Sequence, residues 1–153
     1  MTQLYDLLDK VKDSIKNNGI TNTVTFGDIF EIDLNKTTIF SLAHIVLGNI
    51  TFSEHTIIAT IQVLFLDVVD YSKEKQTEDN FYGDDNLQDV LNTQMQAVNK
   101  LQSDLRRGDL FSDRFQLIDD IVAEPFLERF ENELAGWGVT IDVQLANDTV
   151  SVC

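Results

Sequence analysis

Hydrophobic residues recur at two different spacings along this chain, and the spacing separates expected helices from expected strands. Near the start they repeat every three or four positions, which places them on one face of a helix. Its members are Leu4, Leu7, Leu8, Val11 and Ile15. Asn17-Asn18-Gly19 should end this helix, because glycine readily adopts the left-handed conformation that closes helices.

A second stripe of helical spacing predicts a longer central helix, over residues 87–105. The stripe consists of Leu87, Val90, Leu91, Met95, Val98, Leu101 and Leu105. Arg106 and Arg107 follow at the negative end of the helix dipole, where cations are favoured. We therefore expect the stripe, Met95 included, to face the core.

Elsewhere the period is two, which is typical of strands with one apolar face. Short runs of this kind lie within residues 24–34. An apolar run over residues 40–47 follows, and Gly48-Asn49 comes after it. Residues 56–69 form the strongest expected strand. Both of its faces are apolar toward its end, as in a central strand covered on both sides.

Two further strands are expected after the central helix. The first, around residues 115–122, is less regular, and Pro125 should limit its continuation. The second begins at Trp137, where apolar and polar residues alternate as far as Leu145. Short connections favour antiparallel pairing. The order of elements predicts an α+β fold, in which a mainly antiparallel sheet packs against the N-terminal helix and the long central helix.

The chain has 153 residues, which fits one domain spanning residues 1–153. A polar, acidic segment at about residues 70–85 lacks any periodicity, and loops of that length are uncommon in compact domains. Phe81 and Tyr82 are unusual within it. Aromatic side chains on a polar loop are often buried by a partner, although packing against their own subunit is the alternative.

Charge limits the classes of partner. Eleven basic and 26 acidic residues give a net charge of −15, which repels phosphate backbones and anionic lipid. We therefore expect neither specific nucleic-acid binding nor membrane association. The longest apolar stretch is interrupted by Thr60, Gln62 and Asp67, and no signal peptide is expected at the start. The single cysteine, Cys153, excludes an internal disulfide and fits a reducing compartment.

The candidate chemistry is sparse. His44 lies in an apolar run, which indicates a packed, hydrogen-bonded histidine, and His55 lies in an expected turn. Two aspartate pairs are read as strand ends that open turns: Asp67 with Asp70, and Asp119 with Asp120. The acidic residues of the 70–85 segment lack the alternating spacing of a calcium loop. We expect no catalytic residues, metal site or cofactor, and no enzymatic activity.

Two segments carry a resemblance to a known family: Phe40-Ser-Leu-Ala-His-Ile-Val-Leu-Gly-Asn49 and Leu134-Ala-Gly-Trp137. Together with the order of elements, they resemble tail-terminator or tail-completion (neck) proteins of tailed bacteriophages, as in crAss-like and other phages of Bacteroidetes hosts. Family members often have proline where this chain has Ser41. The resemblance implies a virion protein that forms a ring, usually a hexamer, around the DNA channel and contacts other neck, connector and tail proteins. Such a protein assembles in the cytoplasm of the bacterial host.

A ring needs contacts between its subunits. The candidates are the 70–85 segment and the residues after the central helix, and they comprise Tyr71, Phe81, Tyr82, Arg106, Arg107 and Phe111. Two other functions remain open. One is an acidic adaptor or inhibitor that binds a basic partner; the other is a small enzyme with carboxylates around Asp67, Asp70 or Glu124.

Overall fold

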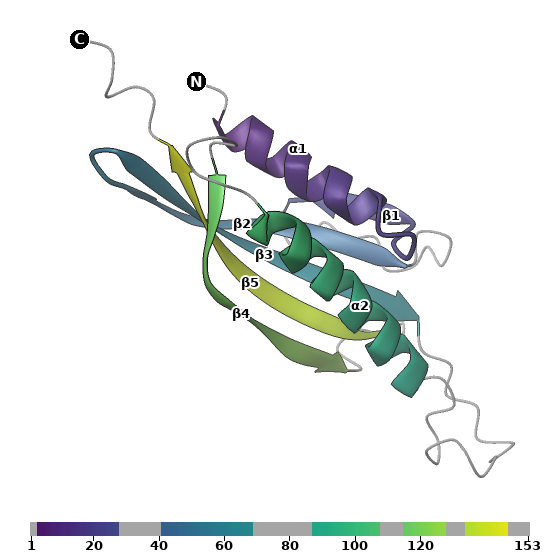
Figure 1. The fold of residues 1–153 in the computed structure, drawn as a ribbon. Helices are drawn as coiled ribbons and strands as arrows, with labels where there is room; N and C mark the ends of the chain where they lie inside the picture. Colours follow the sequence, from purple (N-terminus) through teal and green to yellow (C-terminus); the bar gives the residue numbers. More distant parts are fainter. Residues whose placement is uncertain (1–2, 28–40, 69–86, 108–114, 128–133, 147–153) are drawn as a thin grey trace, which may run out of the picture.

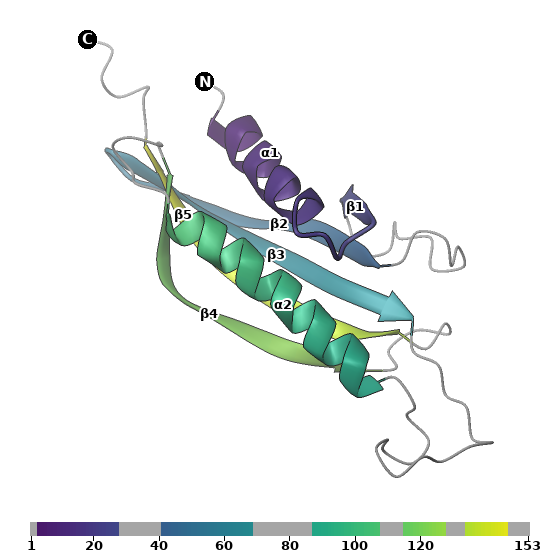
Figure 2. The same ribbon diagram turned by 45° about the vertical axis from the view of Figure 1, so that its right-hand side comes forward.

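The computed structural model describes residues 3–27, 41–68, 87–107, 115–127 and 134–146. They form two helices, α1 (Gln3–Lys16) and α2 (Leu87–Arg106). The strands are β1 (Thr23–Phe26), β2 (Leu42–Phe52), β3 (Thr56–Val68), β4 (Phe115–Leu127) and β5 (Leu134–Ala146). Both helices lie over the same face of a single five-stranded sheet, as Figures 1 and 2 show. The predicted α+β fold is confirmed.

The strands lie in the order β1-β2-β3-β5-β4, so β3 occupies the centre, as predicted. Three of the four pairings are antiparallel, but β1 pairs with β2 in parallel. The described sheet is thus mainly antiparallel, as predicted, with one parallel pair at its edge. Residues 27–41 separate the two strands, and parallel neighbours need a connection of about a dozen residues or more.

The core lies between the helices and the sheet. Alternate residues of β3 and β5 are paired in register and face the helices, for example Ile61 opposite Ile141 and Val63 opposite Val139. The stripe of α1 is buried against them, as predicted, through Leu7, Val11 and Ile15. Gly19 has a φ of 76°, the left-handed conformation expected at the end of α1.

The opposite face of the sheet has two distinct halves. Near the end of β3, Leu64 and Leu66 are buried, as are Leu42 and Leu134 on the neighbouring strands. Toward the other end, polar residues such as Gln62 and Thr140 are exposed. The prediction that β3 is buried on both faces toward its end is therefore confirmed.

Polar contacts fix α2 between its neighbours. The Ser14 hydroxyl of α1 donates a hydrogen bond of 2.5 Å to the Asp104 carboxylate of α2. The Gln94 side chain, which is 0% exposed, donates one of 2.8 Å to Ser41. The Trp137 indole N–H donates one of 2.8 Å to the Leu91 carbonyl. Trp137 thus holds α2 on β5, and it lies partly buried on the core face.

The buried stripe of α2 differs from the predicted one. Gln94 occupies a core position between Val90 and Ala97, whereas Met95 is 50% exposed. The prediction that Met95 faces the core was wrong. The buried positions 90, 94, 97, 98, 101 and 105 also have helical spacing, and a helix that buries them turns Met95 outward. The hydrogen bond to Ser41 satisfies the nitrogen of the buried Gln94 amide and offsets part of the cost of its burial, whereas Gln94 Oε1 is buried without a partner among the described residues.

Two strands run further than the sequence pattern suggested. β2 continues through Gly48 with a shift of register between Leu47 and Ile50. β4 continues past Pro125, because it is an edge strand and one side of its backbone needs no partner within the sheet. The prediction that Asp119 and Asp120 end a strand was wrong. They lie within β4, at a bulge between Ile118 and Val122. None of the described helices is long and apolar enough to cross a membrane.

Candidate functional site

Four of the six proposed subunit-contact residues lie outside the described residues: Tyr71, Phe81, Tyr82 and Phe111. The long acidic segment and Asp70 lie there as well. Arg106 and Arg107 are described, and both are exposed at the C-terminal end of α2. The structure places Arg106, but not Arg107, in a groove that the sequence did not predict.

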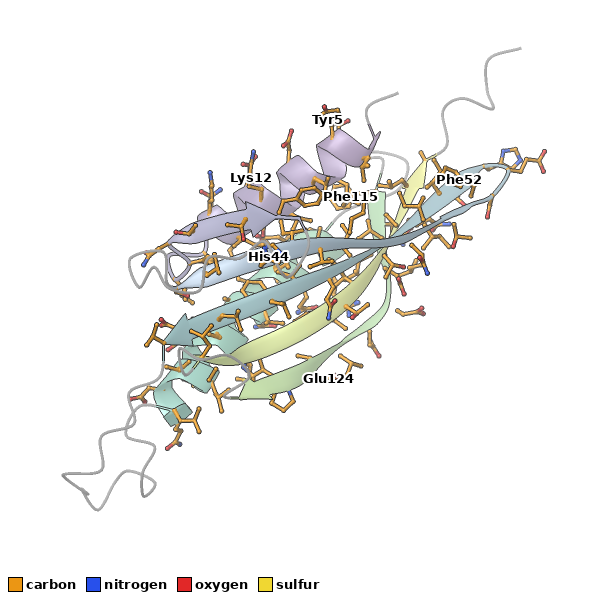
Figure 3. All side chains as sticks on the ribbon, turned by 180° about the vertical axis from the view of Figure 1, so that it is seen from behind. Tyr5, Lys12, His44, Phe52, Phe115 and Glu124 are labelled. Carbon is orange, nitrogen blue, oxygen red and sulfur yellow. The ribbon has the colours of Figure 1, made fainter. Side chains whose placement is uncertain are left out.

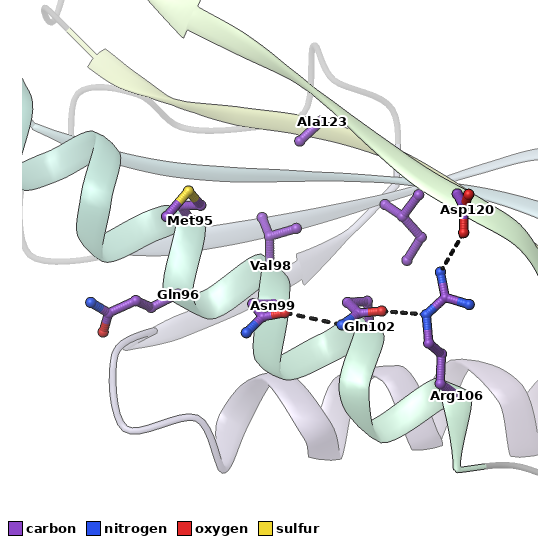
Figure 4. A pocket seen from close by; sticks show the side chains of 9 residues that line it. Met95, Gln96, Val98, Asn99, Gln102, Arg106, Asp120 and Ala123 are labelled. Carbon is purple, nitrogen blue, oxygen red and sulfur yellow. Dashed lines mark hydrogen bonds and ion pairs between the residues drawn. The ribbon is translucent and has the colours of Figure 1, made fainter.

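The groove lies between the exposed side of α2 and the middle of β4 and has a volume of about 540 Å³ (Figure 4). Its apolar lining comes from both elements and consists of Met95, Val98, Ile121 and Ala123. Its polar lining consists of Gln96, Asn99, Gln102, Arg106 and Asp120. We call this feature the α2–β4 groove. Its combination of an apolar surface with a few polar groups is typical of binding sites.

A chain of hydrogen bonds orders the polar side of the α2–β4 groove. The Gln102 amide donates to the Asn99 side chain at 3.0 Å and accepts from Arg106 Nε at 2.5 Å. Arg106 Nη2 then reaches the Asp119 carbonyl and the Asp120 carboxylate, each at 3.4 Å. The long contacts and the exposed Asp120 carboxylate make this ion pair weak. The guanidinium is therefore held in place but remains accessible to another acid.

The bulge of β4 shapes the β4 side of this groove. Three residues, Asp119 to Ile121, occupy the stretch where β5 has Ile141 alone. Asp119 has a φ of 62°, a conformation that aspartate tolerates better than most residues. The bulge brings the Asp119 carbonyl and the Asp120 carboxylate to Arg106 and places Ile121 in the lining.

A second notable surface is the tip of the β2–β3 hairpin. In Figures 1 and 3 this hairpin projects past the helices at one end of the molecule. Phe52 is 72% exposed there, and residues 51 and 53–55 are exposed too. The Ser53 amide donates to the Thr56 carbonyl at 2.8 Å and closes the turn. His55 lies in this turn, as predicted, 3.9 Å from the Glu54 carboxylate.

The structure separates the carboxylates of the enzymatic alternative. Asp67 is on the helix-covered face, in register with Ala135, whereas Glu124 pairs with Gly138 and faces the opposite side. The two residues therefore do not form an acid/base pair. Burial raises the pKa of Asp67 above its ordinary value of 3.8, and the hydrogen bond that it accepts from the Val68 amide only partly opposes this rise. The described residues contain no group of three or more potential metal ligands.

His44 is a packed histidine, as predicted. It is 1% exposed on the face opposite the helices, and its Nδ1 lies 2.6 Å from the Thr25 hydroxyl. Because Thr25 and His44 are paired in register, this bond joins β1 to β2. His44 therefore stabilises the parallel edge of the sheet.

Sequence reasoning missed both Phe52 and the α2–β4 groove. A turn signal for the hairpin was present in Ser53-Glu54-His55, but nothing in the sequence alone shows that the hairpin extends beyond the helices. The groove depends on the phase of the α2 stripe and on the bulge in β4. Both are set by tertiary contacts.

The comparisons with known proteins add no family. The chain matches no protein-family model and no curated protein.

Proposed function

We propose that the protein is a structural subunit that assembles with copies of itself into a ring, with a hexamer favoured, at the neck or tail of a tailed bacteriophage. The ring surrounds the DNA channel and contacts other neck, connector and tail proteins. Two features support the proposal. Residues 40–49 and 134–137 resemble tail-terminator and tail-completion proteins, and the chain has the α+β fold that this resemblance implies. It places the protein in the virion, after assembly in the bacterial cytoplasm.

The observation that carries the proposal is the projecting β2–β3 hairpin with Phe52 exposed at its tip. A hairpin that extends past its own core has reach toward a neighbouring subunit. A large aromatic side chain there is the kind of group that anchors protein interfaces. A projection that contacts a different surface of the next subunit can form a head-to-tail contact, and such contacts close into rings when the rotation allows.

The charge of the chain supports the same function. A net charge of −15 repels DNA at long range. For a subunit that lines a DNA channel, this repulsion keeps the passing DNA from adhering to the wall. The acidity therefore favours a passage for DNA over a binding site for it.

The first test is the mass of the purified protein in solution, measured by light scattering and native mass spectrometry over a range of concentrations. It is measured alone and mixed with the proteins encoded by neighbouring genes. We expect a closed oligomer, alone or on such a partner, and a ring in electron micrographs. A protein that stays monomeric and binds none of these partners would refute the proposal.

The acidic segment gives a second test. Deletion of residues 74–84 should impair assembly and leave the circular dichroism spectrum unchanged. Unaffected assembly would exclude a role for the segment. The adaptor alternative predicts another result: capture of a basic, nucleic-acid-binding protein that is lost as salt screens the attraction.

A further inference from the structure

We infer that the tip of the β2–β3 hairpin of one copy docks in the α2–β4 groove of a second copy of this chain, with Phe52 against its apolar lining and Glu54 at Arg106. This inference rests on the proposed ring and names its subunit contact. The argument has three parts: the shape of the two surfaces, their charge and their placement on the molecule.

The two surfaces match in size and polarity. The groove of about 540 Å³ lies in the range of binding pockets, roughly 300–1,000 Å³. It is larger than one aromatic side chain requires, so it also has room for the backbone on either side of Phe52. Met95, at 50% exposure, is the flexible part of the lining. Methionine adapts to an inserted aromatic ring and makes favourable sulfur–aromatic contacts.

The charges of the two surfaces are complementary. Glu54, with 81% of its side chain exposed, lies two residues from Phe52 at the tip. Arg106 lies at the polar end of the groove with 42% of its side chain exposed, and Arg107 follows it. In a chain with a net charge of −15, most surfaces repel a second copy. The groove lining carries one arginine and one carboxylate, Arg106 and Asp120, so it is less acidic than most of the surface. The Arg106–Asp120 pair is long and exposed, which leaves the guanidinium able to accept an acidic tip of this kind.

The placement of the surfaces requires two copies. Within one subunit the tip does not occupy the groove, because Phe52 is 72% exposed and is not part of the lining. Figure 1 shows the hairpin leaving the body at one end. The groove is lined by residues of α2 and of the middle of β4, away from this tip. When the tip of each subunit enters the socket of the next copy, and not of the copy that it receives, the contact is heterologous. Each subunit then gives one tip and receives another, as a closed ring requires.

The decisive test is a charge exchange between the tip and the groove, read as the mass of the assembly in solution. Glu54→Arg alone and Arg106→Glu alone should each shift the protein toward monomer. The double variant E54R/R106E should restore assembly, since the pair is rebuilt with opposite polarity. Failure of the double variant to recover, where both single variants are impaired, would overturn the pairing of Glu54 with Arg106.

Shape is tested with substitutions at exposed positions, which spare the fold. Phe52→Ala should raise the midpoint concentration of assembly by about tenfold or more, as the loss of an aromatic anchor does. Met95→Trp should block the groove with a similar effect. Thr93→Trp is the matched control, because Thr93 is exposed on α2 but does not line the groove. If F52A and M95W assemble like T93W, the docking inference is wrong.

Disulfide trapping gives an independent result. In a Cys153→Ser background, F52C/M95C should form a ladder of covalent multimers under mild oxidation. Either single-cysteine variant cannot exceed a dimer. A ladder supports the head-to-tail contact; a ring that forms without any crosslink contradicts the inference but leaves the proposed function intact. A wild-type chain that never assembles, alone or with partners, overturns the proposed function itself.

Discussion

At the centre of the sheet, β3 pairs with β5 without interruption, from Thr56 opposite Ala146 to Val68 opposite Leu134. At the edge, β4 pairs with the same β5 in two segments, separated by the bulge at Asp119 to Ile121. The central residues facing the helices are buried and apolar. On the β4 side, Met95 and Val122 are exposed and Arg106 makes only long contacts with β4.

The difference shows how one sheet serves two purposes. The centre uses its side chains for its own stability. On the β4 side, apolar surface and the oriented Arg106 guanidinium remain exposed to solvent. Exposed apolar surface of this kind departs from the usual burial of apolar residues, and such departures are expected at functional sites. Substitutions should therefore have large effects on folding at the centre and small ones beside β4.

The largest effect is expected at Gly136, where β5 leaves no room for a side chain against the backbone of β3. A Cβ atom there would lie 1.7 Å from the Phe65 carbonyl oxygen, and β3 is held on both sides by its neighbours. Gly136→Ala should lower the free energy of unfolding by about 3 kcal/mol or more, the upper range for overpacking. Chemical denaturation measures this loss.

Gly19→Ala is the control for Gly136→Ala. Gly19 has a positive φ, but a Cβ added to it meets nothing within 4 Å. Its substitution should cost about 1 kcal/mol, the price of the left-handed conformation alone. Equal losses at the two glycines would contradict the close approach of β5 to β3.

An intermediate effect separates the two sides of α2. Leu101→Ala removes a buried side chain from the core and should cost about 2–4 kcal/mol. Met95→Ala, on the groove side, should change stability by no more than about 0.5 kcal/mol. Thermal and chemical unfolding of both variants test the contrast. A large loss at Met95 would show that the groove is part of the core.

A smaller loss than at Leu101 is expected at the contact between the two helices. Ser14→Ala removes the hydrogen bond to Asp104 and should cost about 1–2 kcal/mol near neutral pH. That bond lowers the pKa of Asp104 below its ordinary value of 3.8, and Lys100 lowers it further, while burial acts in the opposite direction. A lowered carboxyl pKa stabilises the fold above the ordinary value, and this stability is lost as the pH falls through the lowered one.

The difference between wild type and Ser14→Ala should accordingly shrink in acid. Unfolding measured from neutral pH down to about pH 2 tests it, because the loss begins near the ordinary carboxyl pKa and continues through the lowered pKa of Asp104. A difference that stays constant would show that Asp104 is not the acceptor that matters.

The elements that carry clear periodicity were predictable from the sequence. The α1 stripe and the alternation after Trp137 depend on local spacing. A segment with one strong period can bury its apolar residues in only one type of secondary structure. The central position of β3 followed from its two apolar faces. These features need no knowledge of distant residues.

The remaining features depend on contacts that are remote in the sequence. Gln94 is buried because Ser41 lies within reach of its amide, and Met95 is exposed as a result of the same helix phase. Pro125 is tolerated because β4 lies at an edge, and β1 is parallel because residues 27–41 allow it. The α2–β4 groove combines the phase of α2 with the bulge of β4, so local pattern could not reveal it.

The uninterrupted pairing of β3 with β5 also determines when the fold can form. Thr56 and Ala146 are neighbours in the sheet but lie far apart in sequence, and β5 is the last described strand to be synthesised. Until β5 emerges from the ribosome, one edge of the most apolar strand is open. Contacts of such long range slow folding, and an open apolar edge invites pairing with other chains. In copies that are synthesised close together, premature association through this edge therefore competes with correct folding. This competition favours assembly after folding over assembly during synthesis.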